Sequence, residues 1–315
     1  MKNVMVIGGA GFIGSHLCDA LLERGHQVVC VDNLMRGTTD NLIKSNKSER
    51  FFFYEKDATE TAEMEGLMKG HEIDYVFHLA ANSDIQASAK DPDVEFHCTL
   101  STTWSILSAM RKTGVKKLFF ASTSAVYGEQ CDTLLSESTT LLQPVSYYGA
   151  AKMASEAMIH AFAHMNDMDV CVFRFPNVIG PRLTHGVIFD FIHKLEANPG
   201  RLDVLGNGTQ SKPYLHVADL VRGILQQCEA VKGVEIFNLG VESETSVSRI
   251  AEIVRSEMQL PDAEICYGSS NIGWKGDVPH FQFCLDKIYQ TGWRASMSSD
   301  DAVVATVKEV LSCRQ

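Results

Sequence analysis

The sequence predicts an α/β fold built on a doubly wound parallel sheet. Through residue 175, short apolar runs typical of buried strands alternate with segments of helical period. The first strand runs directly into a glycine-rich turn and a helix, and small or hydroxyl-bearing residues follow several later strands. After residue 175 the alternation breaks, which predicts a smaller C-terminal lobe that binds substrate.

Composition and charge exclude several classes of function. The chain has 315 residues, 45% of them hydrophobic and 21% charged, enough for one large α/β domain with a lobe. A net charge of −11 argues against the basic face that nucleic-acid binding needs. The nine cysteines are scattered through apolar runs without Cys-x-x-Cys pairs, and the histidines lack metal-ligand spacing. We therefore expect reduced thiols, a cytoplasmic location, no metal and no membrane span.

The N-terminal unit has the pattern of a dinucleotide site. A strand at 4–7 is followed by Gly8, Gly11 and Gly14, and then by a helix. Such glycines permit a tight turn and close approach to a pyrophosphate, which the helix N-terminus attracts. Asp32 ends the next strand, at 27–31, where a carboxylate binds ribose hydroxyls and opposes a 2′-phosphate. The pattern predicts a Rossmann-type fold that prefers NAD to NADP, with Arg36 as the nearby residue that would soften this preference.

The remaining elements set the expected domains. Further strands are expected at 51–54, 75–79, 117–121, 170–175 and 236–239, and helices at 94–111, 187–198, 247–258 and 301–311. Another helix carries Tyr148. We expect an NAD-binding domain at 1–175, to which a strand near 235–240 returns, and a discontinuous substrate-binding lobe at 176–315. His78 is expected to be a structural histidine within a buried strand.

Tyr148 and Lys152 form the candidate reactive pair. Four residues apart on a helix, they lie on one face, and the ammonium is expected to lower the pKa of the phenol. A phenol that ionises near neutral pH accepts a proton from a substrate hydroxyl. Tyr147 is expected to point elsewhere. The pattern alone also describes an ordinary surface pair on a helix.

Three hydroxyls follow the fifth strand. Ser122, Thr123 and Ser124 stand at the carboxyl edge of the predicted sheet, where doubly wound folds place their chemistry. A hydroxyl there binds a sugar oxygen and passes its proton toward Tyr148. The alternative is that these residues cap a turn.

These motifs together resemble a known family. The markers are GGAGFIG at 8–14, VDNL at 31–34, HLAA at 78–81, STSAVYG at 122–128, YGAAK at 148–152, RFPNVIGPR at 174–182, YLHVADL at 214–220 and WKGDVP at 274–279. The whole chain resembles the extended short-chain dehydrogenases/reductases of the NAD-dependent nucleotide-sugar epimerase/dehydratase family, and within it the UDP-glucose 4-epimerases.

The resemblance implies a role for each matching residue. The catalytic set would be Tyr148, Lys152 and Thr123. The cofactor would be NAD, bound by Gly8, Gly11, Phe12, Ile13, Asp32, Asn33, Asp57, Ala58, Leu79, Ala80, Ala81 and Thr99, together with Tyr148 and Lys152. The substrate would be bound by Ser122, Thr123, Ser124, Tyr148, Asn177, Arg182, Lys212, Lys275, Asp277 and Phe281. Bulky Phe281 would favour a hexose over an N-acetylhexosamine.

The chain departs from the family pattern at three places. Thr99 stands where asparagine is frequent, Lys212 where arginine is common, and Trp274 with Lys275 where an arginine usually precedes Gly-Asp. A lysine is a point charge and lacks the bidentate fork of arginine. These differences bear on substrate geometry and leave the hydride chemistry unchanged.

The expected function is epimerisation of a nucleotide sugar at C4, with UDP-glucose and UDP-galactose as substrates. A 4,6-dehydratase would need acids after the catalytic hydroxyl, and a UDP-glucuronate decarboxylase a glutamate, but Ser124 and Ala125 stand there. A UDP-glucuronate 4-epimerase needs the same catalytic residues and stays open. From another class, a non-catalytic NAD(H)-binding regulator would have no need of the Tyr148–Lys152 pair. By resemblance, a homodimer would form through the helices at about 94–111 and 148–165.

Overall fold

A computed structural model of the chain describes residues 1–82, 85–130, 134–228, 231–270 and 276–313. The chain divides into two compact units. The first comprises Met1–Gly128, Leu141–Arg174 and Ile224–Phe237, and the second Glu129–Thr140, Phe175–Gly223 and Asn238–Gln315.

The first unit contains a seven-stranded sheet in the order β12-β7-β5-β4-β1-β2-β3. The strands are β1 (Asn3–Ile7), β2 (Gln27–Asp32), β3 (Phe51–Glu55), β4 (Tyr75–His78), β5 (Lys117–Thr123), β7 (Asp169–Phe175) and β12 (Val234–Asn238). Neighbours from β3 to β5 pair in parallel. The strand order reverses beside β1, between β2 and β4, and such a switch point is where doubly wound sheets bind ligands. The predicted doubly wound α/β fold is confirmed.

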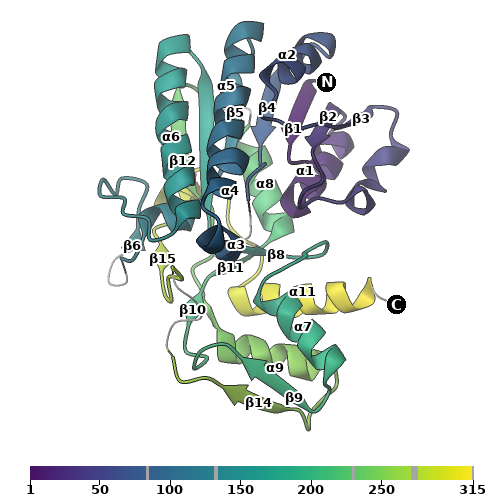
Figure 1. Cartoon of the computed structure of the whole chain (residues 1–315), viewed down its shortest axis with the longest axis vertical. Coiled ribbons are helices and arrows are strands. Elements are labelled where there is room, and N and C mark those ends of the chain that lie inside the picture. Colours follow the sequence, from purple (N-terminus) through teal and green to yellow (C-terminus); the bar gives the residue numbers. More distant parts are fainter. Residues whose placement is uncertain (83–84, 131–133, 229–230, 271–275, 314–315) are drawn as a thin grey trace. The chain divides into compact units, whose positions relative to one another are not determined.

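Helices cover both faces of this sheet (Figure 1). They are α1 (Phe12–Glu23), α2 (Thr61–Gly70), α3 (Ile85–Lys90), α4 (Asp93–Glu95), α5 (Thr102–Thr113) and α6 (Tyr147–Asn166), with α8 (Val217–Gln227) crossing the boundary between the units in sequence. Met64 of α2, Ile106 of α5 and Ile159 of α6 are buried in one cluster with Met5 and Ile7 of β1. Because side chains alternate along β1, its Val4 and Val6 face the opposite side, on which α1 packs.

The helix expected at 94–111 differs in detail from the observed one. The short α4 passes into a π-helix, Phe96–Ser101, and then into α5. A widened π turn shifts the backbone hydrogen-bond register without changing the apolar pattern, so hydrophobic period does not reveal it. Among the described residues, no helix combines the length and the hydropathy that a membrane crossing requires.

The second unit combines short strand pairs with packed helices. Its strands pair as β8 (Asn177–Ile179) with β11 (Tyr214–His216), β9 (Arg201–Val204) with β14 (Glu264–Tyr267), β10 (Ser211–Lys212) with β13 (Thr245–Ser246), and β6 (Leu134–Leu135) with β15 (Gln282–Phe283). Its helices are α7 (Val187–Ala197), α9 (Val247–Glu257), α10 (Asp286–Gln290) and α11 (Ser299–Ser312). Ile192, Ile250 and Val303 bury α7, α9 and α11 against one another.

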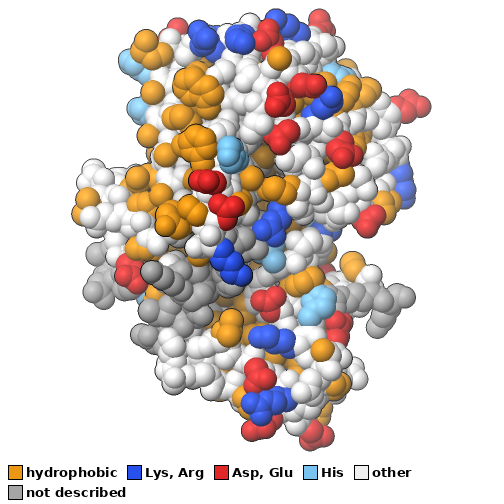
Figure 2. Space-filling model, in the orientation of Figure 1, with side chains coloured by type: hydrophobic (Ala, Val, Ile, Leu, Met, Phe, Trp, Pro, Cys, Tyr) orange, Lys and Arg blue, Asp and Glu red, His pale blue; other side chains and the backbone are white. Residues whose placement is uncertain are grey.

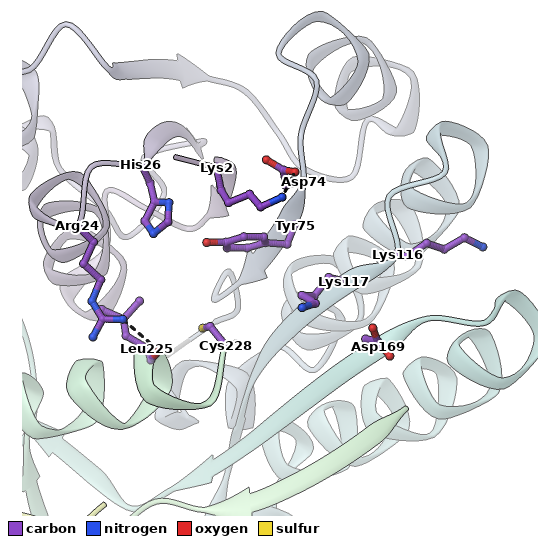
Figure 3. A pocket seen from close by; sticks show the side chains of 10 residues that line it. All are labelled: Lys2, Arg24, His26, Asp74, Tyr75, Lys116, Lys117, Asp169, Leu225 and Cys228. Carbon is purple, nitrogen blue, oxygen red and sulfur yellow. Dashed lines mark hydrogen bonds and ion pairs between the residues drawn. The ribbon is translucent and has the colours of Figure 1, made fainter. Parts of the chain in front are cut away.

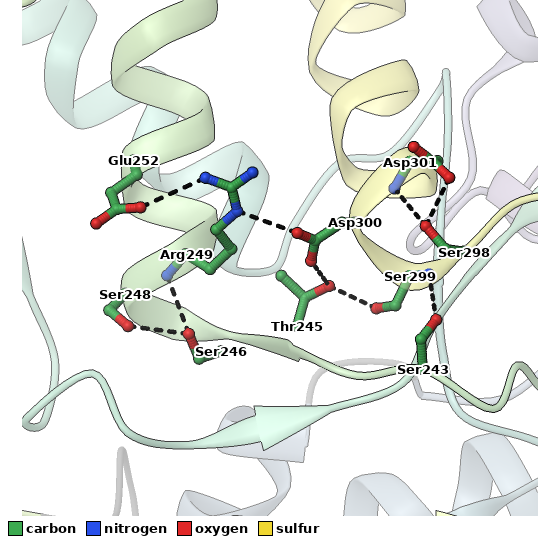
Figure 4. A network of polar contacts seen from close by, with 10 residues as sticks. All are labelled: Ser243, Thr245, Ser246, Ser248, Arg249, Glu252, Ser298, Ser299, Asp300 and Asp301. Carbon is green, nitrogen blue, oxygen red and sulfur yellow. Dashed lines mark hydrogen bonds and ion pairs between the residues drawn. The ribbon is translucent and has the colours of Figure 1, made fainter.

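Polar contacts join α9 to α11 in this unit (Figure 4). Arg249 Nε donates to Asp300 Oδ2 at 3.0 Å, and Thr245 Oγ1 donates to Asp300 Oδ1 at 2.7 Å. Thr245 also shares a hydrogen bond with Ser299, at 2.6 Å. The network fixes the start of α11 beside β13, and it contains none of the predicted site residues.

Candidate active site

The glycine turn after β1 is shaped for close approach of a ligand. Gly8 has φ +79°, and a Cβ there would lie 2.6 Å from Ala80 N. A Cβ at Gly14 would lie 2.1 Å from Gly8 O, so the turn and α1 touch through backbone alone. Gly11 caps α1 without a side-chain hydrogen bond, and Phe12 and Ile13 form its first turn. The first amides of α1 are therefore available to an anion such as a pyrophosphate.

Asp32 is fixed at the end of β2. Its Oδ2 accepts a hydrogen bond from Ala10 N at 3.0 Å, and its Oδ1 accepts one from Leu34 N at 2.9 Å. Burial raises the pKa of Asp32, while these hydrogen bonds act in the opposite direction. The carboxylate thus links the glycine turn to β2, at the position where the sequence predicts a ribose ligand.

Three other residues predicted to bind NAD lie beside one another. Asn33 Nδ2 donates to Asp57 Oδ2 at 3.2 Å. Burial opposes ionisation of Asp57, but hydrogen bonds from Thr59 and Asn33 leave its pKa below the usual value. Ala58 next to it is buried. The ends of β2 and β3 are therefore joined by a hydrogen-bonded polar edge.

The end of β4 completes this side of the site. Leu79 N and Ala80 N both donate to Ile7 O, at 2.9 and 3.0 Å, so the chain after β4 follows the end of β1. Ala81 continues this segment half-buried. Because the side chains here are small, they project little from the carboxyl edge of the sheet beside the switch point.

Tyr148 meets Thr123 where α6 begins. Ser146 caps α6 by accepting a hydrogen bond from Gly149 N at 3.1 Å. A Cβ at Gly149 would lie only 2.6 Å from Ala125 O, so the glycine lets α6 approach the turn Ser124–Tyr127. The side chain of Thr123 lies near the phenol of Tyr148, where it acts to lower the pKa of that phenol. Tyr147 is 55% exposed, so its side chain points away from buried Lys152, as predicted.

Lys152 is buried one turn further along α6. It is 1% exposed, its Nζ donates to Ala121 O at 2.6 Å, and it lies 4.6 Å from the centroid of the Phe120 ring. Burial lowers the pKa of Lys152 to about 8, although Glu95 and Glu156 act to raise it. An ordinary surface pair on a helix is thereby ruled out.

The expected pKa of Tyr148 is corrected by the structure. The sequence predicts that Lys152 lowers it, but burial raises the pKa of Tyr148 well above its usual value. Glu95 raises it further, and the hydrogen bond from Thr123 lowers it. The helical spacing of four residues fixes which face the two side chains share, whereas their tertiary surroundings set the proton affinity.

His78 and Thr99 are buried side chains of the same unit. His78 of β4 is fully buried, its Nε2 lies 3.0 Å from Thr103 Oγ1, and burial with the Lys152 charge lowers its pKa to about 3. His78 is therefore neutral and structural, as predicted. Thr99, expected at the cofactor, is buried in the π-helix and donates to Glu95 Oε2 at 2.9 Å.

Sequence reasoning missed an ion pair beneath the site. Glu156 of α6 receives two hydrogen bonds from Arg174 of β7, from Nε at 3.0 Å and from a terminal nitrogen at 2.5 Å. Ser122 also donates to Glu156, and Arg174 lies over the ring of Tyr127 at 4.8 Å. The Ser122 hydroxyl therefore belongs to this network. Of the three hydroxyls at the carboxyl edge of the sheet, Thr123 and the half-buried Ser124 remain.

The second unit carries the other predicted substrate residues. Asn177 pairs with Tyr214 across β8 and β11. Lys212 of β10 forms an ion pair with Asp277, and burial together with Asp277 raises the pKa of Tyr214. Phe281 is buried, 5.5 Å from Phe283 between ring centroids. Arg182 has φ +68° in the loop after β8. Lys275 lies outside the described residues.

A cavity of about 490 Å³ lies at the other edge of the seven-stranded sheet (Figure 3). Its lining includes Lys2, Asp74 and Lys116, each of which directly precedes a strand, and Asp169, which begins β7. Lys2 and Asp74 form an ion pair at 2.9 Å. The amino-terminal edge is not where parallel sheets carry their chemistry, so this cavity is not the candidate active site.

Comparison with known proteins identifies the family. Residues 4–240 match the NAD dependent epimerase/dehydratase family. The chain belongs to this family. The UDP-glucuronate 4-epimerase of Thermodesulfobacterium geofontis is 33% identical over 81% of this chain and 80% of its own.

Two solved structures extend the similarity to the fold. A UDP-galactose 4-epimerase has a TM-score of 0.86 and 36% identity, and the match covers 99% of both chains. A dTDP-glucose 4,6-dehydratase from Streptomyces venezuelae, solved with NAD, has a TM-score of 0.90 and 25% identity, covering 99% of this chain and 98% of that one. The relatives thus include both epimerases and a dehydratase.

The cofactor is NAD, and the described residues fit it. The side-chain-free turn at Gly8, Gly11 and Gly14 leaves room for a pyrophosphate at the start of α1. Asp32 presents a carboxylate at the end of β2, which suits ribose hydroxyls and opposes a 2′-phosphate. The chain is therefore an NAD-dependent nucleotide-sugar epimerase or dehydratase.

Proposed function

We propose that this protein epimerises a UDP-hexose at C4, with UDP-glucose and UDP-galactose as the substrate pair. The observation that carries the proposal is that Tyr148 and Thr123 lie together at the carboxyl edge of the sheet, one helical turn from buried Lys152. A phenol beside a hydroxyl in this position accepts a proton from a sugar alcohol and returns it. Both directions of a redox epimerisation need that exchange.

Each residue of this set has a distinct role in the proposal. Tyr148 Oη accepts the proton of the C4 hydroxyl, and Thr123 Oγ1 holds the same oxygen by hydrogen bonding. Lys152, buried one helical turn from the phenol, is proposed to hold the nicotinamide ribose of NAD. When bound, NAD supplies reversible oxidation at C4. Glu156, paired with Arg174, fixes the turn of α6 that carries Lys152.

The two residues after Thr123 favour epimerisation over dehydration. Dehydration needs acidic groups beside the catalytic hydroxyl to move protons at C5 and C6. Ser124 and Ala125 occupy these positions and carry no ionisable group. A UDP-glucuronate 4-epimerase is the second candidate, supported by the 33% identity to such an enzyme, and it differs only in the groups that surround C6.

The second unit is proposed to hold the nucleotide and to select the sugar. Asn177, Arg182 and Lys212 are the proposed ligands of the diphosphate, and Lys275 is added from the family pattern. Because Asp277 pairs with Lys212, it holds that ammonium in place and offsets part of its charge. Phe281 is proposed to limit the sugar pocket to a hexose.

We also propose a homodimer formed through α5 and α6. Hydrophobic side chains gather over these helices (Figure 2). Trp104 of α5 is 55% exposed and packs edge-on against Phe162 of α6 at 5.4 Å. Phe96 and Met165 are also exposed. A second copy of the chain would bury this apolar surface, which monomeric proteins rarely leave in water.

The scattered cysteines support a cytoplasmic location.

A substrate panel tests the proposal. The purified protein with NAD is incubated with UDP-glucose, UDP-galactose, UDP-N-acetylglucosamine, UDP-glucuronate and dTDP-glucose, and the products are separated by chromatography. We expect interconversion of the first two without loss of water. Turnover of UDP-glucuronate alone would favour the second candidate, and a dehydrated keto-sugar product would overturn epimerisation.

A further inference from the structure

Glu95 places a fixed carboxylate in the reactive unit, and none of the sequence motifs includes it. It ends α4 and is 2% exposed. Its Oε1 accepts a hydrogen bond from Asn82 Nδ2 at 2.8 Å, and its Oε2 accepts one from Thr99 Oγ1 at 2.9 Å. Asn82 is itself fully buried and directly follows Ala81. Both carboxylate oxygens are thus oriented, in each case by an uncharged donor.

The π-helix explains why Glu95 is held in this position. Thr99 lies four residues after Glu95 in the wide turn Phe96–Ser101, and its side chain reaches back to the carboxylate. Turns of this type are frequent at functional sites. Helix α6, which carries Tyr148 and Lys152, packs against both α4 and the π-helix. Glu95 therefore faces the helix of the reactive pair.

The charges around Lys152 single out Glu95. A buried ammonium is costly unless a negative charge lies near it. The ionisable groups that act on Lys152 are Glu95 on α4, Glu156 on its own helix and neutral His78 on β4. Glu156 accepts hydrogen bonds from Nε and one terminal nitrogen of Arg174, whose charge compensates its own. Glu95, whose described hydrogen bonds come from uncharged groups, is also the carboxylate that acts on Tyr148.

We propose that Glu95 is a positioning residue for the Tyr148–Lys152 pair, a fixed negative charge that holds Lys152 as an ammonium and restrains ionisation of Tyr148. The physical basis is simple electrostatics, because a nearby carboxylate favours the charged form of a lysine and disfavours that of a phenol. The residue acts through the pair and does not need to touch substrate. The proposal rests on the proposed function only in treating Tyr148 as the base.

The first test measures Lys152 directly. In the NAD-saturated protein, the side-chain amine of Lys152 is titrated by NMR with isotope-labelled lysine and assigned with Lys152→Met. Glu95→Gln keeps an acceptor for Asn82 and offers a donor to Thr99, so it removes the charge with little change of shape. We expect it to lower the pKa of Lys152 by about one unit. Asp93→Asn, on the exposed face of α4, is the matched control and is expected to leave that pKa unchanged.

The second test uses the pH profile of turnover. Removing the negative charge lowers the pKa of both Tyr148 and Lys152, so both limbs of the profile of Glu95→Gln are expected to move to lower pH by about one unit. If Glu95 had a purely structural role, Glu95→Gln would lower the rate without moving the limbs of the pH profile. Glu95→Asp retains the charge and is expected to keep the profile of the unmodified protein.

The outcomes separate this inference from the proposed function. An unchanged pKa of Lys152 in Glu95→Gln overturns the inference, and so does a shift of equal size in Glu95→Asp. If the pKa moves as expected but none of the nucleotide sugars is turned over, the electrostatic role of Glu95 stands and the proposed function fails.

Discussion

Gly149→Ala adds one methyl group at the closest approach between α6 and the turn after β5. The new Cβ would lie 2.6 Å from Ala125 O and 3.0 Å from Pro144 Cβ. A carbon normally approaches a carbonyl oxygen to about 3.3 Å, so the helix and the turn must separate by about 0.7 Å. Tyr148 and Thr123 lie on opposite sides of this contact, and the separation therefore moves the phenol away from the threonine hydroxyl.

That displacement sets the expected loss of activity. A misplacement of about 1 Å in a reacting pair costs about 100-fold in rate, so turnover should fall about 10- to 100-fold. The free energy of unfolding should fall by about 1–3 kcal/mol, because the new methyl overpacks a closed contact. NAD binding should be unchanged, since the turn at Gly8 and Gly14 is not affected. Initial rates with UDP-galactose, urea denaturation and NAD titration measure the three quantities.

Gly66→Ala is the matched control. Gly66 lies in α2, and a Cβ there would have no neighbour within 4 Å. Alanine should stabilise the helix by about 0.5–1 kcal/mol and leave turnover unchanged. If Gly149→Ala retained turnover within about twofold of the unmodified protein while Gly66→Ala behaved as expected, the close approach at Gly149 would not position Tyr148.

Three other predictions concern burial, charge and assembly. Glu156→Ala leaves Arg174 buried without its partner and should lower the free energy of unfolding by about 3–5 kcal/mol in urea; a loss near zero would contradict the pairing. The pKa of Lys152 is about 8 in the folded chain and about 10.4 when unfolded, so the unfolded state binds more protons between these values and stability should rise with pH there. Urea titrations across that window should show this rise in the unmodified protein and not in Lys152→Met, and parallel curves would contradict it. Trp104→Glu should convert the proposed dimer to a 34.8 kDa monomer in sedimentation, whereas Leu205→Glu, at a residue of the second unit that is also exposed, should not; an unchanged mass for Trp104→Glu would contradict the proposed interface.

Much of the fold was predictable because the apolar patterns of strands and helices repeat over residues that are close in sequence. The strands that end at Ile7, Asp32 and Thr123 could be located from apolar runs bounded by glycines and hydroxyls. The pairing of β6 with β15 was not predictable, since it joins segments almost 150 residues apart through two residues each. Such a pairing depends on tertiary geometry and leaves little local pattern.

For the candidate site, the sequence predicted the cofactor and the shared face of the reactive pair better than it predicted the electrostatics. The spacing of Tyr148 and Lys152 gave their shared face, and the glycine turn gave the cofactor. The predicted direction of the Tyr148 pKa shift was wrong because burial, which the sequence does not specify at a single residue, raises that pKa, and Glu95 raises it further. Glu95 was missed because its position depends on a π turn and on Asn82, which approaches it from a different segment.

The central claim is that Tyr148 exchanges a proton with the sugar alcohol while NAD stays bound. Its most direct test is the near-ultraviolet absorbance of reduced nicotinamide when UDP-galactose is added to the NAD-loaded protein and to its Tyr148→Phe variant. We expect a reduced fraction and C4 interconversion in the unmodified protein, and in the variant bound NAD with neither. Near-normal turnover by Tyr148→Phe would contradict the account.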